Sequence, residues 1–183
     1  MELVKKVELN KILKIILIAF LGSLLLTISA KIKIPFYPVP MTMQTFVVIF
    51  LGIAFGYKIG VMTIFLYLLE GILGLPVFSN SPEKGIGIAY FVGPTMGYLI
   101  GFIFACFLAG CFKYNSNYII NFVKILASTS VIYIFGVIWL GTLIGWDKPI
   151  LQLGVFPFLL AELFKILLLT LLVNKIIRLR KFI

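Results

Sequence analysis

The chain has 183 residues, of which 62% are hydrophobic and 12% are charged, and its mean hydropathy is +1.20. This composition excludes an ordinary soluble domain and predicts an integral membrane protein. The formal net charge of +10 does not indicate nucleic-acid binding, because the basic residues flank apolar runs and the aromatic residues lie inside those runs.

Apolar segments predict six membrane-spanning helices. The first follows a basic N-terminus but is too long for the hydrophobic part of a signal peptide. The second and third form one stretch that is interrupted near Gly56, giving a hairpin of two spans of about 15 residues each. Because these two are short, five spans remain an alternative. The expected segments are residues 12–30, the interrupted stretch 41–75, and residues 88–111, 118–141 and 153–177.

The lysines and arginines predict that both termini are cytoplasmic, since cytoplasmic loops carry an excess of basic residues. In this orientation eleven basic residues lie inside and four outside, and Lys165 lies within the membrane. The inner set is Lys5, Lys6, Lys11, Lys14, Lys58, Lys113, Lys124, Lys175, Arg178, Arg180 and Lys181, and the outer set is Lys31, Lys33, Lys84 and Lys148.

Three outer connections follow from this topology, at residues 31–40, 74–87 and 142–152. The first, "KIKIPFYPVP", contains three prolines and should be a stiff loop rather than a helix. The second, "GLPVFSNSPEKGIG", mixes apolar anchors with turn residues, so we expect it to form a lid over a cavity.

Small residues recur at every fourth position, which places them on one stripe of a helix where another backbone can approach closely. Packing within the chain is the simplest interpretation of two of these stripes. For a third, Ala19, Ser23 and Thr27, an intermolecular face is an equal alternative. The first two stripes are Gly93, Gly97, Gly101, Ala105 and Ala109, and Gly52, Gly56 and Gly60.

The last apolar run, "LLAELFKILLLTLL", contains an acid and a base, Glu162 and Lys165. A charge at the centre of a membrane helix costs roughly 2.5 to 3.5 kcal/mol, so both require an explanation. Three residues apart, they share one face of a helix. They form either an ion pair that only neutralises itself or a polar site for a ligand, in which the carboxylate accepts N–H groups and the ammonium meets an oxygen.

Four segments in order give the chain a resemblance to the BioY family, the biotin-binding S components of energy-coupling factor (ECF) transporters. They are "KIPFYPVPMTMQTFVV", "LYLLEGILGLPVF", "GPTMGYLIGF" and "PFLLAELFK", and they extend from Lys33 to Lys165. The resemblance implies one all-α domain over residues 1–183, with six helices and a ligand pocket facing outward beneath the first, third and fifth loops.

The resemblance further implies a location in the prokaryotic cytoplasmic membrane and partners that drive transport: a transmembrane coupling subunit and two ATPase subunits. It places Ala19 and Ser23 at the interface with the coupling subunit. No enzymatic activity, metal or cofactor is expected. ATP should bind the partners only, because this chain lacks a phosphate-binding G-x-x-x-x-G-K-[ST] loop.

For biotin, the resemblance assigns the ureido N–H groups to Glu162, where the family pattern has aspartate, and a ligand oxygen or carboxylate to Lys165. Five further residues are candidates for contact with the ligand: Asn80, Gln44, Tyr90, Tyr98 and Lys84. Each also has a structural explanation. The asparagine suits a turn, the glutamine a helix start, the two tyrosines the membrane interface, and the lysine an ion pair with Glu83.

Two rival functions stay open at this point. One is an S component for another vitamin, such as thiamine or riboflavin. The other is an intramembrane lipid-modifying enzyme, which fits poorly because the sequence has no histidine and only one acid–base pair in its sixth span. A channel is disfavoured, because polar residues do not recur along several spans.

Overall fold

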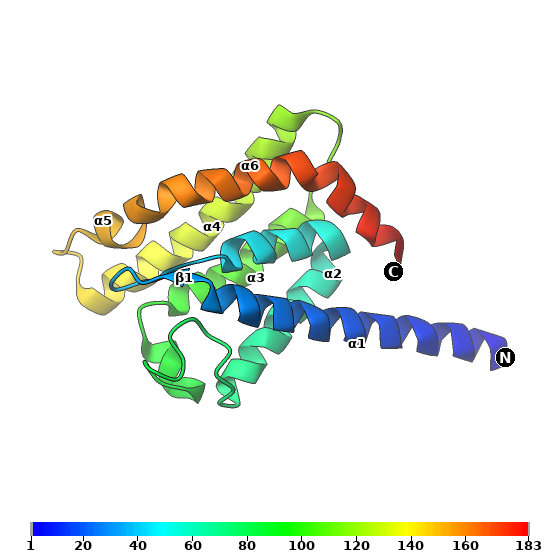
Figure 1. Ribbon diagram of the computed structural model, residues 1–183, viewed down its shortest axis with the longest axis horizontal. Coiled ribbons are helices and arrows are strands. Elements are labelled where there is room, and N and C mark those ends of the chain that lie inside the picture. Colours follow the sequence, from blue (N-terminus) through cyan, green and yellow to red (C-terminus); the bar gives the residue numbers. More distant parts are fainter. Residues whose placement is uncertain (1, 183) are drawn as a thin grey trace.

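The protein is described by a computed structural model that covers residues 2–182, with side chains described for residue 9 and residues 11–181. It is built largely of helices lying alongside one another, with the loops gathered toward the two ends (Figure 1). The elements are α1 (Glu2–Lys31), β1 (Lys33–Ile34), β2 (Met41–Thr42), α2 (Gln44–Ile72), η1 (Gly87–Val92), α3 (Met96–Cys111), α4 (Tyr118–Ile144), α5 (Ile150–Gly154), η2 (Phe156–Phe158), α6 (Leu159–Ile176) and η3 (Ile177–Phe182).

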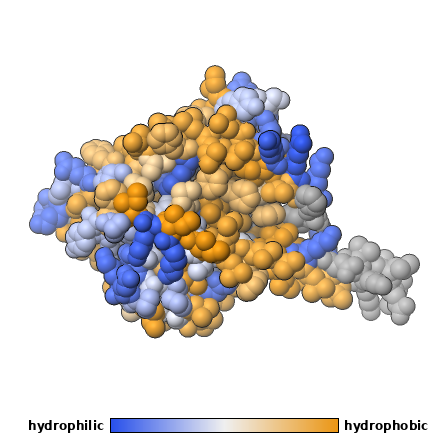
Figure 2. Space-filling model, in the orientation of Figure 1, coloured by the Kyte–Doolittle hydropathy of each residue, from blue (hydrophilic) through white to orange (hydrophobic). Residues whose placement is uncertain are grey.

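The surface of the helices is apolar, as a membrane protein requires. Within the described residues, four helical segments are long and apolar enough to cross a membrane: Lys11–Lys31, Gln44–Ile72, Tyr118–Ile144 and Ile150–Lys181. Figure 2 shows hydrophobic residues over the middle of the molecule and hydrophilic residues toward its ends. This confirms a helical membrane protein. The four segments are fewer than the six expected spans because α2, which contains two of those spans on either side of Gly56, counts once and α3 has only 16 residues.

The interruption predicted near Gly56 is present inside α2. Gly56 has φ 74° and ψ 172°, a conformation that residues with a Cβ atom rarely adopt, and two helices meet there across a kink. The ribbon of α2 accordingly changes direction sharply (Figure 1). Residues 44–55 and 57–72 are therefore two separate short helical arms, as the sequence indicated.

Two predicted helices begin later than expected, and proline is the reason in both. The span expected from residue 88 starts at Met96, after Pro94, and the span expected from residue 153 starts at Leu159, after Pro157. A proline disfavours the helical conformation of the residue before it. Glu162 therefore lies in the first turn of α6, rather than the nine residues into the span that the sequence predicted.

The three connections expected on the outer side have defined structures. In the first, β1 and β2 pair antiparallel, with Lys33 opposite Thr42 and Ile34 opposite Met41. The proline-rich segment between them forms no helix, as predicted. The second contains the 3₁₀ helix η1, and the third contains α5 and η2.

Small residues hold the central helices together. A Cβ atom added to Gly52 would lie 2.5 Å from the Cys106 carbonyl oxygen, and one added to Gly101 would lie 2.7 Å from the Ile132 Cα atom. These contacts join α2 to α3 and α3 to α4. The interpretation of both stripes as packing within the chain is confirmed at these positions.

The stripe on α1 is also buried within the chain. The exposed fractions of Ala19 and Ser23 are 4% and 0%, and the Ser23 hydroxyl lies 2.9 Å from Glu70 Oε1 of α2. Gly22 packs against Thr63, also on α2. Both residues are therefore buried within this chain, and their contact with a coupling subunit stays a prediction.

We expect Gly101→Val to destabilise the fold, because its side chain would overlap the α4 backbone at Ile132. Overpacking of this kind costs about 1 to 3 kcal/mol. Thermal unfolding in detergent should show a melting temperature several degrees lower. Ala127→Val, at an exposed position on α4, is the matched control. Equal melting temperatures for the two variants would contradict the close packing.

Candidate ligand-binding site

A cavity lies between the segment that joins β1 to β2, the connection after α2, η2, the starts of α2, α3 and α6, and the middle of α4. Its empty volume, including the part open to solvent, is about 520 Å³. It is lined by Val39, Pro40, Met41, Thr42, Gln44, Thr45, Phe78, Ser79, Tyr90, Thr95, Tyr98, Leu99, Phe102, Ile132, Tyr133, Phe158 and Glu162.

The charged group of this cavity is the Glu162 carboxylate. Its Oε1 atom accepts hydrogen bonds from Lys165 Nζ at 2.7 Å and from the Thr45 hydroxyl at 2.8 Å. Lys165 Nζ also lies 2.6 Å from the Thr42 carbonyl oxygen and 3.0 Å from Thr45 Oγ1. Both charged side chains are only 8% exposed. The pair thus joins α6 to the start of α2.

These contacts give the acid and the base different roles. An ammonium has three N–H donors, and three acceptors surround Lys165 Nζ within the described chain. Lys165 does not line the cavity, whereas Glu162 does. Glu162 and Lys165 form an ion pair, which is one of the two arrangements predicted from sequence. The Glu162 carboxylate also faces the cavity. Lys165 thus lies outside the cavity lining and is hydrogen-bonded to Glu162, and its contact with a ligand stays a prediction.

A second polar group lines the cavity at the start of α2. Gln44 Nε2 donates to the Tyr67 hydroxyl at 2.7 Å, and that hydroxyl donates to the Val77 carbonyl oxygen at 3.1 Å. The side-chain oxygen of Gln44, Oε1, accepts a hydrogen bond from Thr42 Oγ1 at 3.3 Å. Gln44 is thus both at the start of α2 and in the cavity wall.

Aromatic rings form much of the remaining wall. Tyr90 stacks on Phe78 with ring centroids 4.6 Å apart. The Tyr98 hydroxyl donates to the Gly154 carbonyl oxygen at 2.8 Å, and its ring meets that of Tyr133 edge to face at 6.0 Å. Phe158 completes this part of the wall. Rings fixed in this way provide an apolar surface for a flat ligand.

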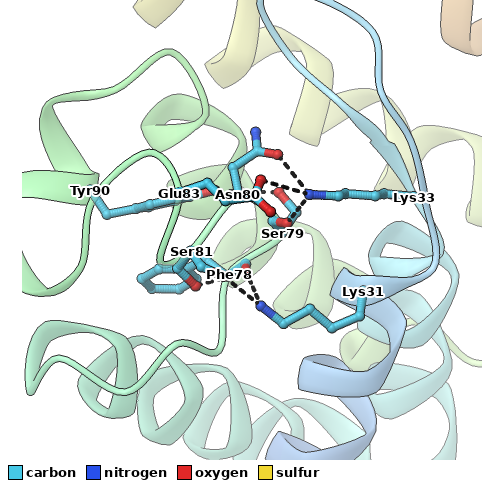
Figure 3. Close-up of polar contacts among 8 residues, drawn as sticks. All are labelled: Lys31, Lys33, Phe78, Ser79, Asn80, Ser81, Glu83 and Tyr90. Atoms are coloured by element: carbon cyan, nitrogen blue, oxygen red, sulfur yellow. Dashed lines mark hydrogen bonds and ion pairs between the residues drawn. The ribbon is translucent and has the colours of Figure 1, made fainter.

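Two lysines hold the connection after α2 over this end of the molecule (Figure 3). Lys31 Nζ donates to the carbonyl oxygens of Phe78 and Ser81 at 2.8 and 2.9 Å. Lys33 Nζ donates to the Ser79 carbonyl oxygen at 2.8 Å and to Asn80 Oδ1 at 3.2 Å. Lys33 also lies 3.7 Å from the Glu83 carboxylate. The predicted lid is therefore fastened to the end of α1 and to β1.

The structure places Asn80 and Lys84 outside the cavity lining. They line a smaller hollow beside it, together with Tyr90. The Asn80 side-chain oxygen accepts a hydrogen bond from Lys33, and Lys84 Nζ lies 5.4 Å from the centroid of the Tyr37 ring. Of the seven ligand-contact residues predicted from sequence, Gln44, Tyr90, Tyr98 and Glu162 surround the cavity, whereas Asn80, Lys84 and Lys165 do not.

Several lining residues were missed by the sequence analysis. Thr45 stands next to Gln44, so helical phase could have suggested it. Ser79 stands next to Asn80, and the conformation of the loop decides which of the two faces inward. Tyr133 and Phe158 carry no local signal, because each lies in an apolar run and is brought to the cavity by tertiary packing.

The fold and cavity define a helical membrane protein with a polar and aromatic cavity toward one end. The sequence pattern of the BioY family matches residues 4–182, and the chain belongs to that family. A probable biotin transporter BioY from Pyrococcus horikoshii is 38% identical over 77% of this chain and 82% of that protein. The biotin transporter BioY from Thermotoga maritima is 36% identical over 78% of this chain and 83% of that protein.

A solved structure agrees with these relatives. A crystal structure of the S-component for biotin from an ECF-type ABC transporter superimposes with a TM-score of 0.76, at 27% identity, over 94% of this chain and 93% of that one. The predicted family is thus confirmed. Because the family consists of transporter components, the lipid-modifying enzyme is set aside and the chain is not an enzyme.

We expect Lys33→Gln to loosen the lid, because the substitution removes an ion pair and the ammonium donor to the Ser79 carbonyl. Hydrogen bonds from charged groups contribute about 1.5 to 3 kcal/mol, so amide exchange in residues 79–83 should quicken by about tenfold. Hydrogen–deuterium exchange with mass spectrometry measures this, with Lys148→Gln as the control. Unchanged exchange in the loop would show that Lys33 does not hold it.

Proposed function

We propose that this chain is the biotin-binding S component of an ECF transporter, which captures biotin from outside the cell. The observation that carries the proposal is the buried Glu162 carboxylate, which lines the cavity and is hydrogen-bonded by Lys165 and Thr45. The names of the relatives from Pyrococcus and Thermotoga and of the matching crystal structure supply the ligand.

The chemistry of biotin suits the lining residues. Its ureido ring has two N–H donors, and the Glu162 carboxylate is an acceptor with lone pairs to spare. Its thioether ring and alkyl tail are apolar, and Tyr98, Tyr133 and Phe158 give them an apolar wall. The tail ends in a carboxylate, which the hydroxyls of Ser79 and Thr95 can bind as donors beneath the lid.

In the proposed topology the chain crosses the membrane six times and acts as one unit over residues 1–183. The crossings are α1, the two arms of α2, α3, α4 and α6, and both termini lie in the cytoplasm. The grouping of Lys11, Lys58, Lys113 and Arg180 around one hollow supports this, because all four belong to the expected inner set.

The proposed setting is the prokaryotic cytoplasmic membrane. There a transmembrane coupling subunit and two ATPase subunits supply the energy for uptake. The likeness to a component of an ECF-type ABC transporter supports these partners. The contact of the coupling subunit with Ala19 and Ser23, which are buried within this chain, stays part of the proposal.

Biotin binding is the direct test of the proposed ligand. Protein purified from biotin-starved cells should bind labelled biotin saturably and should not exchange it for thiamine or riboflavin. Binding of either of those vitamins in place of biotin would favour an S component of different specificity. A folded preparation that binds none of the three would contradict the proposal.

Substitutions at the polar site should weaken biotin binding without unfolding the protein. Loss of a charged hydrogen-bond acceptor in Glu162→Gln should weaken it by about tenfold to a hundredfold. Thr45→Val, which removes one hydroxyl donor to Glu162, should have a smaller effect in the same direction. Lys148→Gln, at an exposed position, is the control in the same titration. Wild-type affinity in Glu162→Gln would remove the carboxylate from the site.

The topology can be tested with single cysteines in a Cys106→Ser, Cys111→Ser background. A cysteine replacing Ser116, between α3 and α4, should react with a membrane-impermeant maleimide only after the cells are opened. A cysteine replacing Lys148, between α4 and α5, should react in intact cells. The reverse pattern, or equal labelling of both, would contradict the orientation.

A further inference from the structure

A second hollow lies at the end of the molecule away from the ligand cavity, between the start of α1, the kink of α2, the end of α3 and η3. Its empty volume, including the part open to solvent, is about 1,070 Å³. Four cationic side chains line it: Lys11, Lys58, Lys113 and Arg180. None of the described residues that line it is acidic. The hollow therefore concentrates positive charge without internal neutralisation.

One of the four cations is fixed in the wall. Arg180 Nε donates to the Ile53 carbonyl oxygen at 2.8 Å, and Nη2 lies 3.3 Å from the Gly52 and 3.2 Å from the Gly110 carbonyl oxygens. A guanidinium has five N–H donors. These three bonds use Nε and Nη2, and the two N–H groups of Nη1 form no hydrogen bond with the described residues. Arg180 thus closes the ends of the first arm of α2 and of α3, and keeps two donors for a ligand.

The three lysines differ from Arg180 in being exposed. None of them forms an ion pair with a side chain that the structure describes. Lys58 Nζ approaches only the ring of Tyr57, at 6.0 Å from its centroid. Exposed ammonium groups that form no ion pair with the described residues, arranged around a fixed guanidinium, suit a phosphate group, which accepts several charged hydrogen bonds at once.

The walls of the hollow are apolar between the cations. Ile15, Phe55 and Phe112 line it. On α1, just past Lys11, Ile12 and Ile16 are exposed by 53% and 57% and continue the apolar surface along the helix. A ligand that fits both features carries a phosphate next to long hydrocarbon chains. Basic pockets between membrane helices bind anionic lipid head groups in this way.

We propose that this hollow is a binding site for an anionic phospholipid, with its phosphate among Lys11, Lys58, Lys113 and Arg180 and its acyl chains along α1. A soluble phosphate compound shares the charge but leaves the apolar surface uncovered. An acidic segment of another protein would likewise neutralise the charge but leave the exposed apolar face of α1 uncovered. The site does not depend on the identity of the transported ligand.

The test is native mass spectrometry of the full chain in detergent, titrated with dioleoyl phosphatidylglycerol or dioleoyl phosphatidylcholine. The two lipids have the same acyl chains and differ in net charge. The anionic lipid should bind at least about tenfold more tightly. The double variant Lys58→Gln, Lys113→Gln should lose this preference and keep its binding of phosphatidylcholine. Lys84→Gln, Lys148→Gln removes the same charge elsewhere and should keep the preference.

Three results would overturn the site. One is equal affinity of the wild-type chain for the two lipids, and another is equal loss of preference in the two double variants. The third is displacement of phosphatidylglycerol by glycerol 3-phosphate at equal concentration, which would identify a site for soluble phosphates. Lys58→Arg, Lys113→Arg keeps the charge and should bind like the wild type, which separates lost charge from altered folding.

Discussion

The buried pair of Glu162 and Lys165 is the contact on which the ligand cavity depends. Removing two charges from water costs several kcal/mol for each ion, and a bare pair rarely recovers that cost. Here Thr42 and Thr45 supply the missing partners. Glu162 also lies in the first turn of α6, where the helix dipole favours a negative charge. The same contacts tie α6 to β2 and α2, so the groups that stabilise the carboxylate also build the cavity wall.

Closure of the cavity depends on weaker contacts. Lys31 and Lys33 bind backbone carbonyl groups of the lid and one largely exposed carboxylate. The same connection carries Phe78 and Tyr90, which stack on each other and are buried in the core. A rigid wall with a lid held by solvent-accessible charges is a physically reasonable way to admit a ligand and then enclose it.

Much of the fold was readable from sequence because membrane helices carry strong local signals. Apolar runs located the helices, Gly56 located the kink of α2, and prolines marked the first outer loop. Helix starts near Pro94 and Pro157 were missed, since the flanking residues are as apolar as the helices themselves. At the site, Glu162 was predictable because a charge in an apolar run is costly. The placement of Ser79 rather than Asn80 in the cavity, and the arrival of Tyr133 and Phe158, depend on loop conformation and packing that no local pattern records.

An experimental structure with biotin bound would test the proposed site most directly. We expect biotin in the cavity between α2, α3, α4 and α6, with a ureido nitrogen about 2.9 Å from a carboxylate oxygen of Glu162, and with Lys165 still bound to Thr42 and Thr45. Biotin bound elsewhere, for example in the apolar groove beside Phe164 and Leu168, or bound in the cavity without contact to Glu162, would contradict this assignment.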